Sequence, residues 1–217
     1  MCFSFRPEID INQIKAETGA ALAQRSFDLF KENNAEGLLE TVFPNTWSLA
    51  LISTKHGPTL LPMRYRLRPQ DSSEEIPVKY NLYNARVESL ESKKTWSRLL
   101  SRNHVAIPMK AFNEWVPTEK GKRIVQFSLA NTPTFWSAGL FDIWENPEDK
   151  SKLVSFAIIT SSPTQYIAEV GHDRCPIIMD KQQALKWIQI RGSSEMAINF
   201  LPKDMDKLDF KHEFITL

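Results

Sequence analysis

The sequence LVSFAIIT at residues 153–160 is a strongly apolar run of strand length, and we expect it to form the central strand of a sheet. Further segments with strand character precede and follow it, whereas helical patterns are fewer and do not alternate regularly with strands. Such an order is typical of the α+β class. The expected strands cover residues 47–52, 60–67, 104–108, 123–129, 135–144 and 177–179, and the expected helices follow Asp10, begin at Lys94 and follow Asp180.

Length and composition indicate a globular intracellular protein. The chain has 217 residues, 42% hydrophobic and 24% charged, and no linker or repeat divides it, so we expect one domain over residues 1–217. No apolar run approaches the roughly 20 residues of a membrane span, and no secretory signal is expected. Two cysteines make no disulfide framework, which favours a cytoplasmic location. The net charge of +1 argues against general polyanion coating but permits a local basic groove.

Cys2 directly follows Met1 and is small enough for Met1 to be removed. Removal leaves an α-amine, with an ordinary pKa of about 7.7–8.0, beside a thiol with a pKa of about 8.5. An N-terminal Cys can act as a nucleophile with its own amine as base, or can capture an aldehyde as an imine that the sulfur closes into a thiazolidine. A Cys at position 2 is by itself weak evidence for a catalytic role, and only the motifs described below strengthen that evidence.

Arg64, Arg66 and Arg68 alternate within and just after the expected strand 60–67. A period of two places all three side chains on one face of an extended segment. They form either a solvated strand face or a rail for phosphates, because guanidinium groups match phosphate oxygens. The sequence leaves both interpretations open.

Three motifs follow Cys2 in order: NARVE at residues 84–88, AFNEW at 111–115 and GHDRCP at 171–176. Together with Cys2 they resemble the SRAP family, the SOS response-associated peptidases, which are also described as abasic-site processing proteins. The family pattern is MCGR, then NARxE, then GFYEW, then HDRMP. The flanking segment WSAGL at residues 136–140 is also similar, and the resemblance covers nearly the whole chain.

The resemblance implies both a fold and an activity. The fold is a single α+β domain whose mostly antiparallel sheet curls toward a barrel with flanking helices. The activity is abasic-site processing, in which Cys2 forms a covalent thiazolidine crosslink to an abasic site in single-stranded DNA and shields the lesion in the SOS response. Self-removal of Met1 by a thiol peptidase activity and a lyase-like activity are also implied. We expect a monomer, associated with the nucleoid when bound to DNA, that needs no cofactor, metal or membrane.

Carried over by motif, the family pattern assigns chemistry to four positions. Cys2 is the nucleophile, Asn84 positions its α-amine, Glu114 is an acid and base, and His172 is a second proton-handling group near the sugar. The residues expected to contact DNA are Arg86, Trp115, Thr160, Arg66 and Arg64.

The chain departs from the family pattern beside the expected site. Phe3 and Ser4 replace the usual Gly-Arg, which tightens the backbone space and removes a phosphate contact. Asn113 stands where Tyr is usual, and Arg66 lies where Gly is usual, so Arg66 is a hypothetical replacement for the missing Arg. These changes leave the four chemical positions intact but affect DNA affinity and substrate preference.

The residues alone leave other interpretations of the same positions. Glu114, between Phe112 and Trp115, is either a carboxyl whose pKa is raised by burial or a solvent-facing carboxylate. His172 suits proton transfer, with an ordinary pKa near 6.5, but a lone His is more often structural. Trp115 either stacks on a base or packs in the core. No His lies at metal-ligand spacing, so no metal is assigned.

Two other functions remain open from the sequence. One is a cysteine-type peptidase in which Cys2 and His172 form a nucleophile–base pair. The other is a non-catalytic single-stranded-DNA-binding module, which Phe3 and Ser4 suggest. Retention of Met1 discriminates between capture and simple binding, because it should abolish aldehyde capture and leave binding unaffected.

Overall fold

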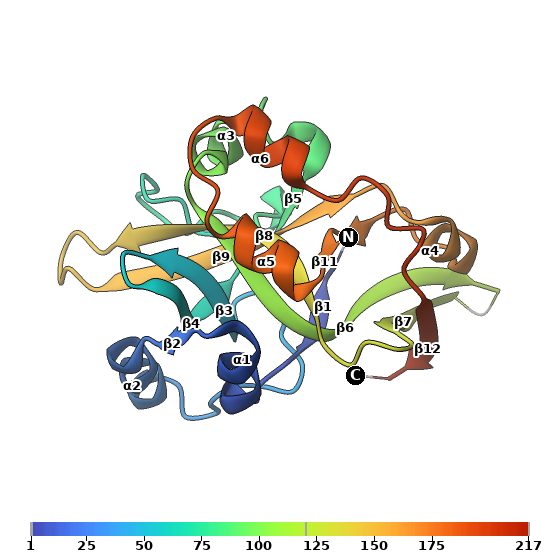
Figure 1. Ribbon diagram of the computed structural model, residues 1–217, viewed down its shortest axis with the longest axis horizontal. Coiled ribbons are helices and arrows are strands. Elements are labelled where there is room, and N and C mark those ends of the chain that lie inside the picture. Colours follow the sequence, from blue (N-terminus) through green and yellow to red (C-terminus); the bar gives the residue numbers. More distant parts are fainter. Residues whose placement is uncertain (1, 120, 217) are drawn as a thin grey trace.

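Five strands close into a barrel in a computed structural model of the chain, which describes residues 2–119 and 121–216 (Figure 1). The last strand of the series pairs back to the first, which removes the open edges of a flat sheet. The α+β class and the barrel-like curl are therefore confirmed. Met1, on whose removal the expected chemistry depends, lies outside the described residues. Around the ring the strands are β8 (Phe135–Glu145), β9 (Lys152–Ser161), β4 (Gly57–Tyr65), β3 (Trp47–Thr54) and β6 (His104–Thr118).

The apolar run at residues 153–160 is the core of β9, as expected. Alternate side chains of this strand enter two different hydrophobic clusters. Phe156 and Ile158 pack with other strand residues across the ring, whereas Ala157 and Ile159 pack in the cluster that includes residues of the helices. A strand buried on both faces needs apolar residues at successive positions, which explains why the run does not alternate.

The far end of β9 brings two of the sequence motifs together. β5 (Asn84–Arg86) pairs in parallel with β9, with Asn84 opposite Ile158. β10 (Cys175–Pro176) pairs antiparallel with the same end, with Pro176 opposite Thr160. Motifs that are about 90 residues apart in the sequence thus flank one strand end.

The third motif lies on β6, which continues without a break through the expected strand 104–108 and beyond it. β1 (Ser4–Pro7) pairs antiparallel with β6, with Ser4 opposite Asn113, and this pairing brings the N-terminal segment beside the AFNEW motif. On its other side β6 pairs with β7 (Gly121–Leu129), to which β12 (Phe210–Ile215) adds a further strand. β12 was not expected from the sequence.

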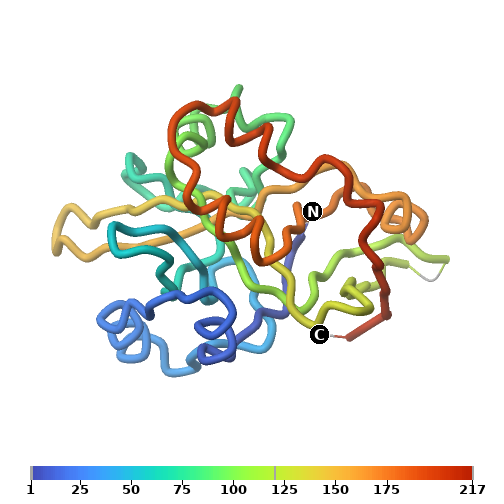
Figure 2. The backbone as a smooth tube through the Cα atoms, viewed as in Figure 1, coloured from blue at the N-terminus to red at the C-terminus, as the bar shows by residue number. Residues whose placement is uncertain are grey.

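Helices cover the outside of the barrel (Figure 2). Asp10 caps α1 (Ile11–Thr18) by accepting hydrogen bonds from the backbone N–H groups of Asn12 and Gln13. α1 ends at Gly19, which adopts a left-handed φ of 68°, so α2 (Gln24–Asn33) is a separate helix. Asp180 caps α5 (Lys181–Trp187) in a capping box. The other described elements are β2 (Ala21–Leu22), α3 (Lys94–Leu100), α4 (Gln165–Val170), β11 (Ile178–Met179), α6 (Ser194–Phe200) and the short 3₁₀ turns Val78–Tyr80 and Val87–Ser89.

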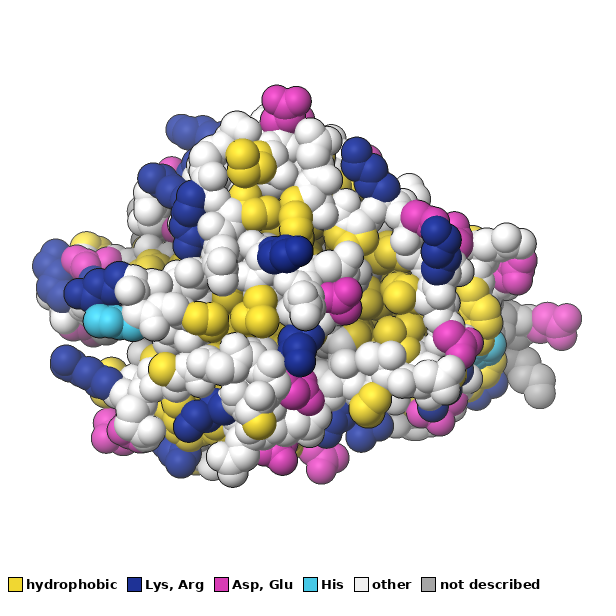
Figure 3. Space-filling model, in the orientation of Figure 1, with side chains coloured by type: hydrophobic (Ala, Val, Ile, Leu, Met, Phe, Trp, Pro, Cys, Tyr) yellow, Lys and Arg dark blue, Asp and Glu magenta, His cyan; other side chains and the backbone are white. Residues whose placement is uncertain are grey.

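Charged side chains are spread over the face of the molecule drawn in Figure 3, where Lys and Arg are interspersed with Asp and Glu. This distribution agrees with the formal net charge of +1. Within the described part of the chain, none of the helices is both long and apolar enough to cross a bilayer.

Gly139 on β8 marks the closest approach in the barrel wall. A Cβ at this position would lie 2.7 Å from the carbonyl oxygen of Ala157 and 2.8 Å from Cδ1 of Ile107. Gly139→Ala should therefore lower the free energy of unfolding by about 1–3 kcal/mol, measured by urea denaturation, and Gly139→Leu should cost more. At Gly37, where an added Cβ meets nothing within 4 Å, Ala and Leu should cost about the same as each other. An equal cost of Ala and Leu at Gly139 would contradict the close approach.

Candidate active site

Cys2 is fully buried, and its backbone is held from two strands. Its carbonyl oxygen accepts hydrogen bonds from the hydroxyl of Tyr65 at 2.9 Å and from Nδ2 of Asn84 at 2.8 Å. Tyr65 is itself stacked on Phe156, with ring centroids 5.2 Å apart. Cys2 is thus anchored at one place in the barrel instead of lying in a solvated tail.

Asn84 contacts Cys2, but through the carbonyl group and not through the predicted α-amine. The amide oxygen of Asn84 is buried and has no hydrogen-bond donor among the described residues. A buried acceptor without a donor is costly, so this atom is suited to receive an N–H group.

The thiol of Cys2 is kept in its protonated form. Burial raises the pKa of this thiol well above its ordinary value, and the nearby Glu114 adds to the effect. The sulfur lies 3.4 Å from the carbonyl oxygen of Ser4. At neutral pH the site therefore holds a thiol and not a ready thiolate, so any chemistry that starts at Cys2 is expected to start at its nitrogen.

Glu114 and His172 form a buried pair in the same region. Oε2 of Glu114 lies 3.1 Å from Nε2 of His172, and the side chains are 1% and 9% exposed. The solvent-facing alternative for Glu114 is therefore excluded. Burial raises the pKa of Glu114 to about 8 and lowers the pKa of His172. Near pH 7 the pair consists of a neutral carboxylic acid and a neutral imidazole, which is an arrangement that can give and take back one proton.

An ion pair between the buried Arg174 and the half-exposed Glu88 joins two of the motifs behind this site. The guanidinium of Arg174 donates to both carboxylate oxygens of Glu88, at 2.8 and 3.0 Å, and to the backbone oxygen of Thr160 at 2.6 Å. Arg174 also positions His172, whose Nδ1 lies 2.9 Å from the Arg174 carbonyl oxygen. The sequence analysis missed this role, although Glu88 and Arg174 are both motif residues. Asp173, by contrast, is 85% exposed.

The three alternating arginines converge on one acid. Arg64 donates to both carboxylate oxygens of Glu75, Arg68 lies 3.6 Å from the same group and Arg66 4.0 Å. Arg66 directly follows the end of β4, has a φ of 98° and is 5% exposed, and it donates further hydrogen bonds to Asn45 and to the carbonyl of Ile76. Contact of Arg64 or Arg66 with DNA stays a prediction, and it requires that a phosphate replace Glu75.

The remaining expected DNA contacts differ in exposure. Arg86 is exposed at the end of β5 and lines a pocket of about 220 Å³ together with Asn84 and Lys93. Trp115 is 46% exposed, so it is not a core residue. Thr160 is fully buried against Arg174 and supports the site from behind. The described residues contain no group of three or more His, Cys, Asp or Glu side chains that could hold a metal ion.

The departures from the family pattern are packed against one another. Phe3 lies against Trp115, with ring centroids 5.5 Å apart. Nδ2 of Asn113 donates to the hydroxyl of Ser4 at 3.0 Å, and both residues are fully buried. Oδ1 of Asn113 accepts from Gln126 at 3.0 Å. Ser4, which replaces the usual Arg, thus forms its hydrogen bond with Asn113, which replaces the usual Tyr.

Comparisons with known proteins give the family and the fold. The family model described as SOS response associated peptidase (SRAP) matches residues 1–213. The abasic site processing protein YoqW of Bacillus subtilis is 27% identical over 171 residues, which cover 77% of this chain and 75% of YoqW. The abasic site processing protein HMCES of Pongo abelii is 26% identical over 65% of this chain and 49% of HMCES. A solved structure from Bacteroides thetaiotaomicron has the same fold, with a TM-score of 0.81 and 17% identity over 99% of this chain and 92% of that one.

Glu88→Gln tests the ion pair behind the site. The hydrogen bonds from Arg174 hold the pKa of Glu88 below its ordinary value, so its contribution to stability is present at neutral pH and is lost as the pH falls through the folded-state pKa. The variant should lose about 1 kcal/mol of unfolding free energy at pH 7, because half of the Glu88 side chain is exposed. Urea denaturation between pH 3 and pH 7 should find a smaller acid-induced loss in the variant. Parallel curves would contradict this role.

Proposed function

Because the chain belongs to the SRAP family, we propose that it processes abasic sites in DNA by covalent capture of the open-chain aldehyde at the amino terminus of Cys2. The observation that carries the proposal is the buried Glu114–His172 pair beside an anchored Cys2. The names of YoqW and HMCES as abasic site processing proteins support the same substrate.

The first part of the reaction uses the nitrogen of Cys2 after Met1 is removed. Glu114, as a neutral acid, protonates the ring oxygen of the closed sugar while the neutral imidazole of His172 takes the proton of the anomeric hydroxyl, so that the ring opens to the aldehyde. The amine then attacks the aldehyde carbon, and the resulting carbinolamine loses water with a proton from the same carboxyl group. His172 shares that proton at 3.1 Å and returns the carboxyl group to its acid form.

The second part uses the sulfur. The thiol of Cys2 adds across the C=N bond, so that a C–S bond forms and the thiol proton goes to the nitrogen. The product is a five-membered thiazolidine, and one water is released overall. This order suits a thiol whose pKa is raised by burial, because the thiol proton passes to the imine nitrogen as the C–S bond forms and no free thiolate is needed. The unpartnered Oδ1 of Asn84 accepts an N–H bond from the Cys2 amine and orients its lone pair.

Single-stranded DNA containing abasic sites is the partner that this geometry fits best. Arg86 is exposed next to Asn84 and contacts a phosphate, and the half-exposed pair of Trp115 and Phe3 offers a surface on which a base next to the lesion stacks. The chain acts as one domain, in the cytoplasm and on the nucleoid, and the adduct shields the lesion during the SOS response.

A thiol peptidase using Cys2 and His172 is less well supported for other substrates. The ring Nε2 of His172 faces Glu114, and burial disfavours the thiolate that a cysteine peptidase needs. Removal of Met1 by the chain itself is retained in the proposal as a single maturation step.

Cys2→Ser separates the two parts of the reaction. Wild-type protein should form an adduct with a single-stranded oligonucleotide carrying one abasic site, and the adduct should survive a denaturing gel. Cys2→Ser keeps the amine, so it should give an adduct only when borohydride is added to reduce the imine. Cys175→Ser, which changes the other buried cysteine, should behave as wild type. If the wild-type protein, with a free Cys2 terminus confirmed by mass spectrometry, forms no adduct, the proposed function is wrong.

The pH dependence of adduct formation tests Glu114. The acid form of this carboxyl is present below its pKa of about 8, so the wild-type rate should fall as the pH rises above that value. Glu114→Gln removes the acid, so its rate should be lower by about 10²-fold or more at pH 7 and should not fall above pH 8. The measurement is the single-turnover rate from pH 6 to pH 10. A high-pH fall that persists in Glu114→Gln would assign the titration to another group.

A further inference from the structure

One face of the β1–β6–β7–β12 sheet carries a row of polar residues, of which Ser4, Asn113 and Gln126 are buried. Side chains on one face of a sheet recur every second residue and lie opposite their register partners. Asn113 is opposite Ser4 on β1 and Gln126 on β7, and Gln126 is opposite Glu213 on β12. Trp115 lies two residues farther along the same face of β6. The face therefore runs continuously from the exposed Trp115 to the far end of β1.

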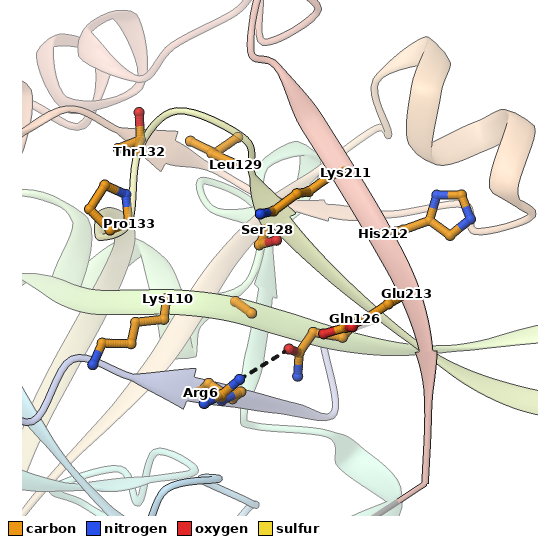
Figure 4. A pocket seen from close by; sticks show the side chains of 11 residues that line it. Arg6, Lys110, Gln126, Ser128, Leu129, Thr132, Pro133, Lys211, His212 and Glu213 are labelled. Atoms are coloured by element: carbon orange, nitrogen blue, oxygen red, sulfur yellow. Dashed lines mark hydrogen bonds between the residues drawn. The ribbon is translucent and has the colours of Figure 1, made fainter.

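At that far end the sheet forms a pocket of about 320 Å³ (Figure 4). Arg6 of β1 and Lys211 of β12 contribute side chains from opposite sides, and Gln126 lies between them. The hydroxyl of Ser128 and the turn at Thr132 are also part of the lining. In Figure 4, Lys211 points across Ser128 into the pocket, while His212 points to the other side of β12.

The cations of this pocket are only partly neutralised. The guanidinium of Arg6 makes one hydrogen bond, to Oε1 of Gln126 at 3.5 Å, and neither Arg6 nor Lys211 forms an ion pair with a described residue. Lys110 is paired with Glu8 at 3.2 Å, and Glu213 is the one acid of the described lining. Two unpaired cations on either side of a neutral amide and a hydroxyl suit a single anion with several acceptor oxygens.

We propose that Arg6 and Lys211 bind a phosphate of the nucleic-acid strand that enters the active site, and this inference rests on the proposed function. The usual Arg of the family pattern is absent at Ser4, which is buried and bonded to Asn113. Arg6, two residues later on the same face of β1, provides the cation instead. Along β6 the distance from Trp115 to Ala111 beside the pocket is about 13 Å. About four stacked nucleotides cover this distance, at about 3.4 Å per phosphate of one strand.

Salt dependence of binding to an undamaged single-stranded oligonucleotide tests the proposal without the covalent step. Each lost phosphate contact lowers the slope of log affinity against log salt by about 0.7 for a single strand. Arg6→Gln/Lys211→Gln should therefore bind several-fold more weakly at low salt, with a slope smaller by about 0.7. Fluorescence anisotropy at four salt concentrations measures both quantities. Arg6→Lys, which keeps the charge, should recover most of the affinity.

Two matched variants control for net charge. Lys150→Gln/Lys152→Gln also removes two positive charges, but from the β8–β9 hairpin on the opposite side of the molecule (Figure 1). The two lysine side chains are 71% and 64% exposed there. This variant should leave the slope unchanged. Glu213→Gln removes the acid of the pocket and should strengthen binding. Equal effects of the two double variants would mean that only net charge matters and would overturn the proposal.

Two further outcomes separate this proposal from related ones. If Cys2 forms no adduct with abasic DNA but binding to the undamaged strand depends on Arg6 and Lys211, the phosphate site stands and the proposed function fails. If the adduct forms and the slope does not change, the phosphate site is wrong. In a last experiment, inorganic phosphate is titrated at constant ionic strength into the complex of the wild-type protein with the undamaged strand. Displacement of the strand from wild type by low-millimolar phosphate would indicate a site for free phosphate and overturn the assignment to the strand.

Discussion

The buried guanidinium of Arg174 is the charge on which the arrangement of the site depends. A charge out of water must be paired and fully hydrogen-bonded, or the fold that buries it is strongly destabilised. Arg174 is paired with the carboxylate of Glu88, and its two terminal nitrogens donate to that carboxylate and to the backbone of Thr160, whereas its buried Nε has no hydrogen-bond partner among the described residues. Because these partners come from β9 and from the segment after β5, the pairing holds the NARVE and GHDRCP motifs at one strand end. Asn84 and His172 take their positions from that junction.

The Glu88–Arg174 ion pair and the candidate active site differ in the charge state that their surroundings favour. At the Glu88–Arg174 pair, the charged forms are favoured because two guanidinium nitrogens of Arg174 donate directly to the carboxylate. In the candidate active site, the low-dielectric interior favours the neutral form of the buried Glu114 and raises its pKa to about 8. The same desolvation keeps the Cys2 thiol and the His172 ring uncharged. A site made of uncharged acids and bases can move protons at neutral pH without binding a counter-ion.

The departures from the family pattern show how local substitutions are accommodated together. Ser4 and Asn113 are too short to reach solvent from their buried positions, and each satisfies the other. Phe3 adds apolar area where the pattern has none and covers it against Trp115. These pairs retain the backbone pairing of β1 with β6, which is what brings Cys2 to the barrel. The four motif residues expected to carry the chemistry therefore keep their place in the pattern, while the side chains packed near them differ from it.

The sequence by itself determined the fold class, the central strand and the caps at Asp10 and Asp180, because these follow from local patterns and from ordered motifs, and the same motifs predicted the four positions expected to carry the chemistry. Only the tertiary structure decided which motif residues meet. It paired Glu88 with Arg174, turned Asn84 toward the carbonyl of Cys2 and directed the three arginines onto Glu75. The physical reason is that partner choice and burial depend on strand register and barrel closure, which join residues far apart in the chain. A hydrophobic pattern that repeats every two residues in a strand, or every 3.6 residues in a helix, carries no information about such distant partners.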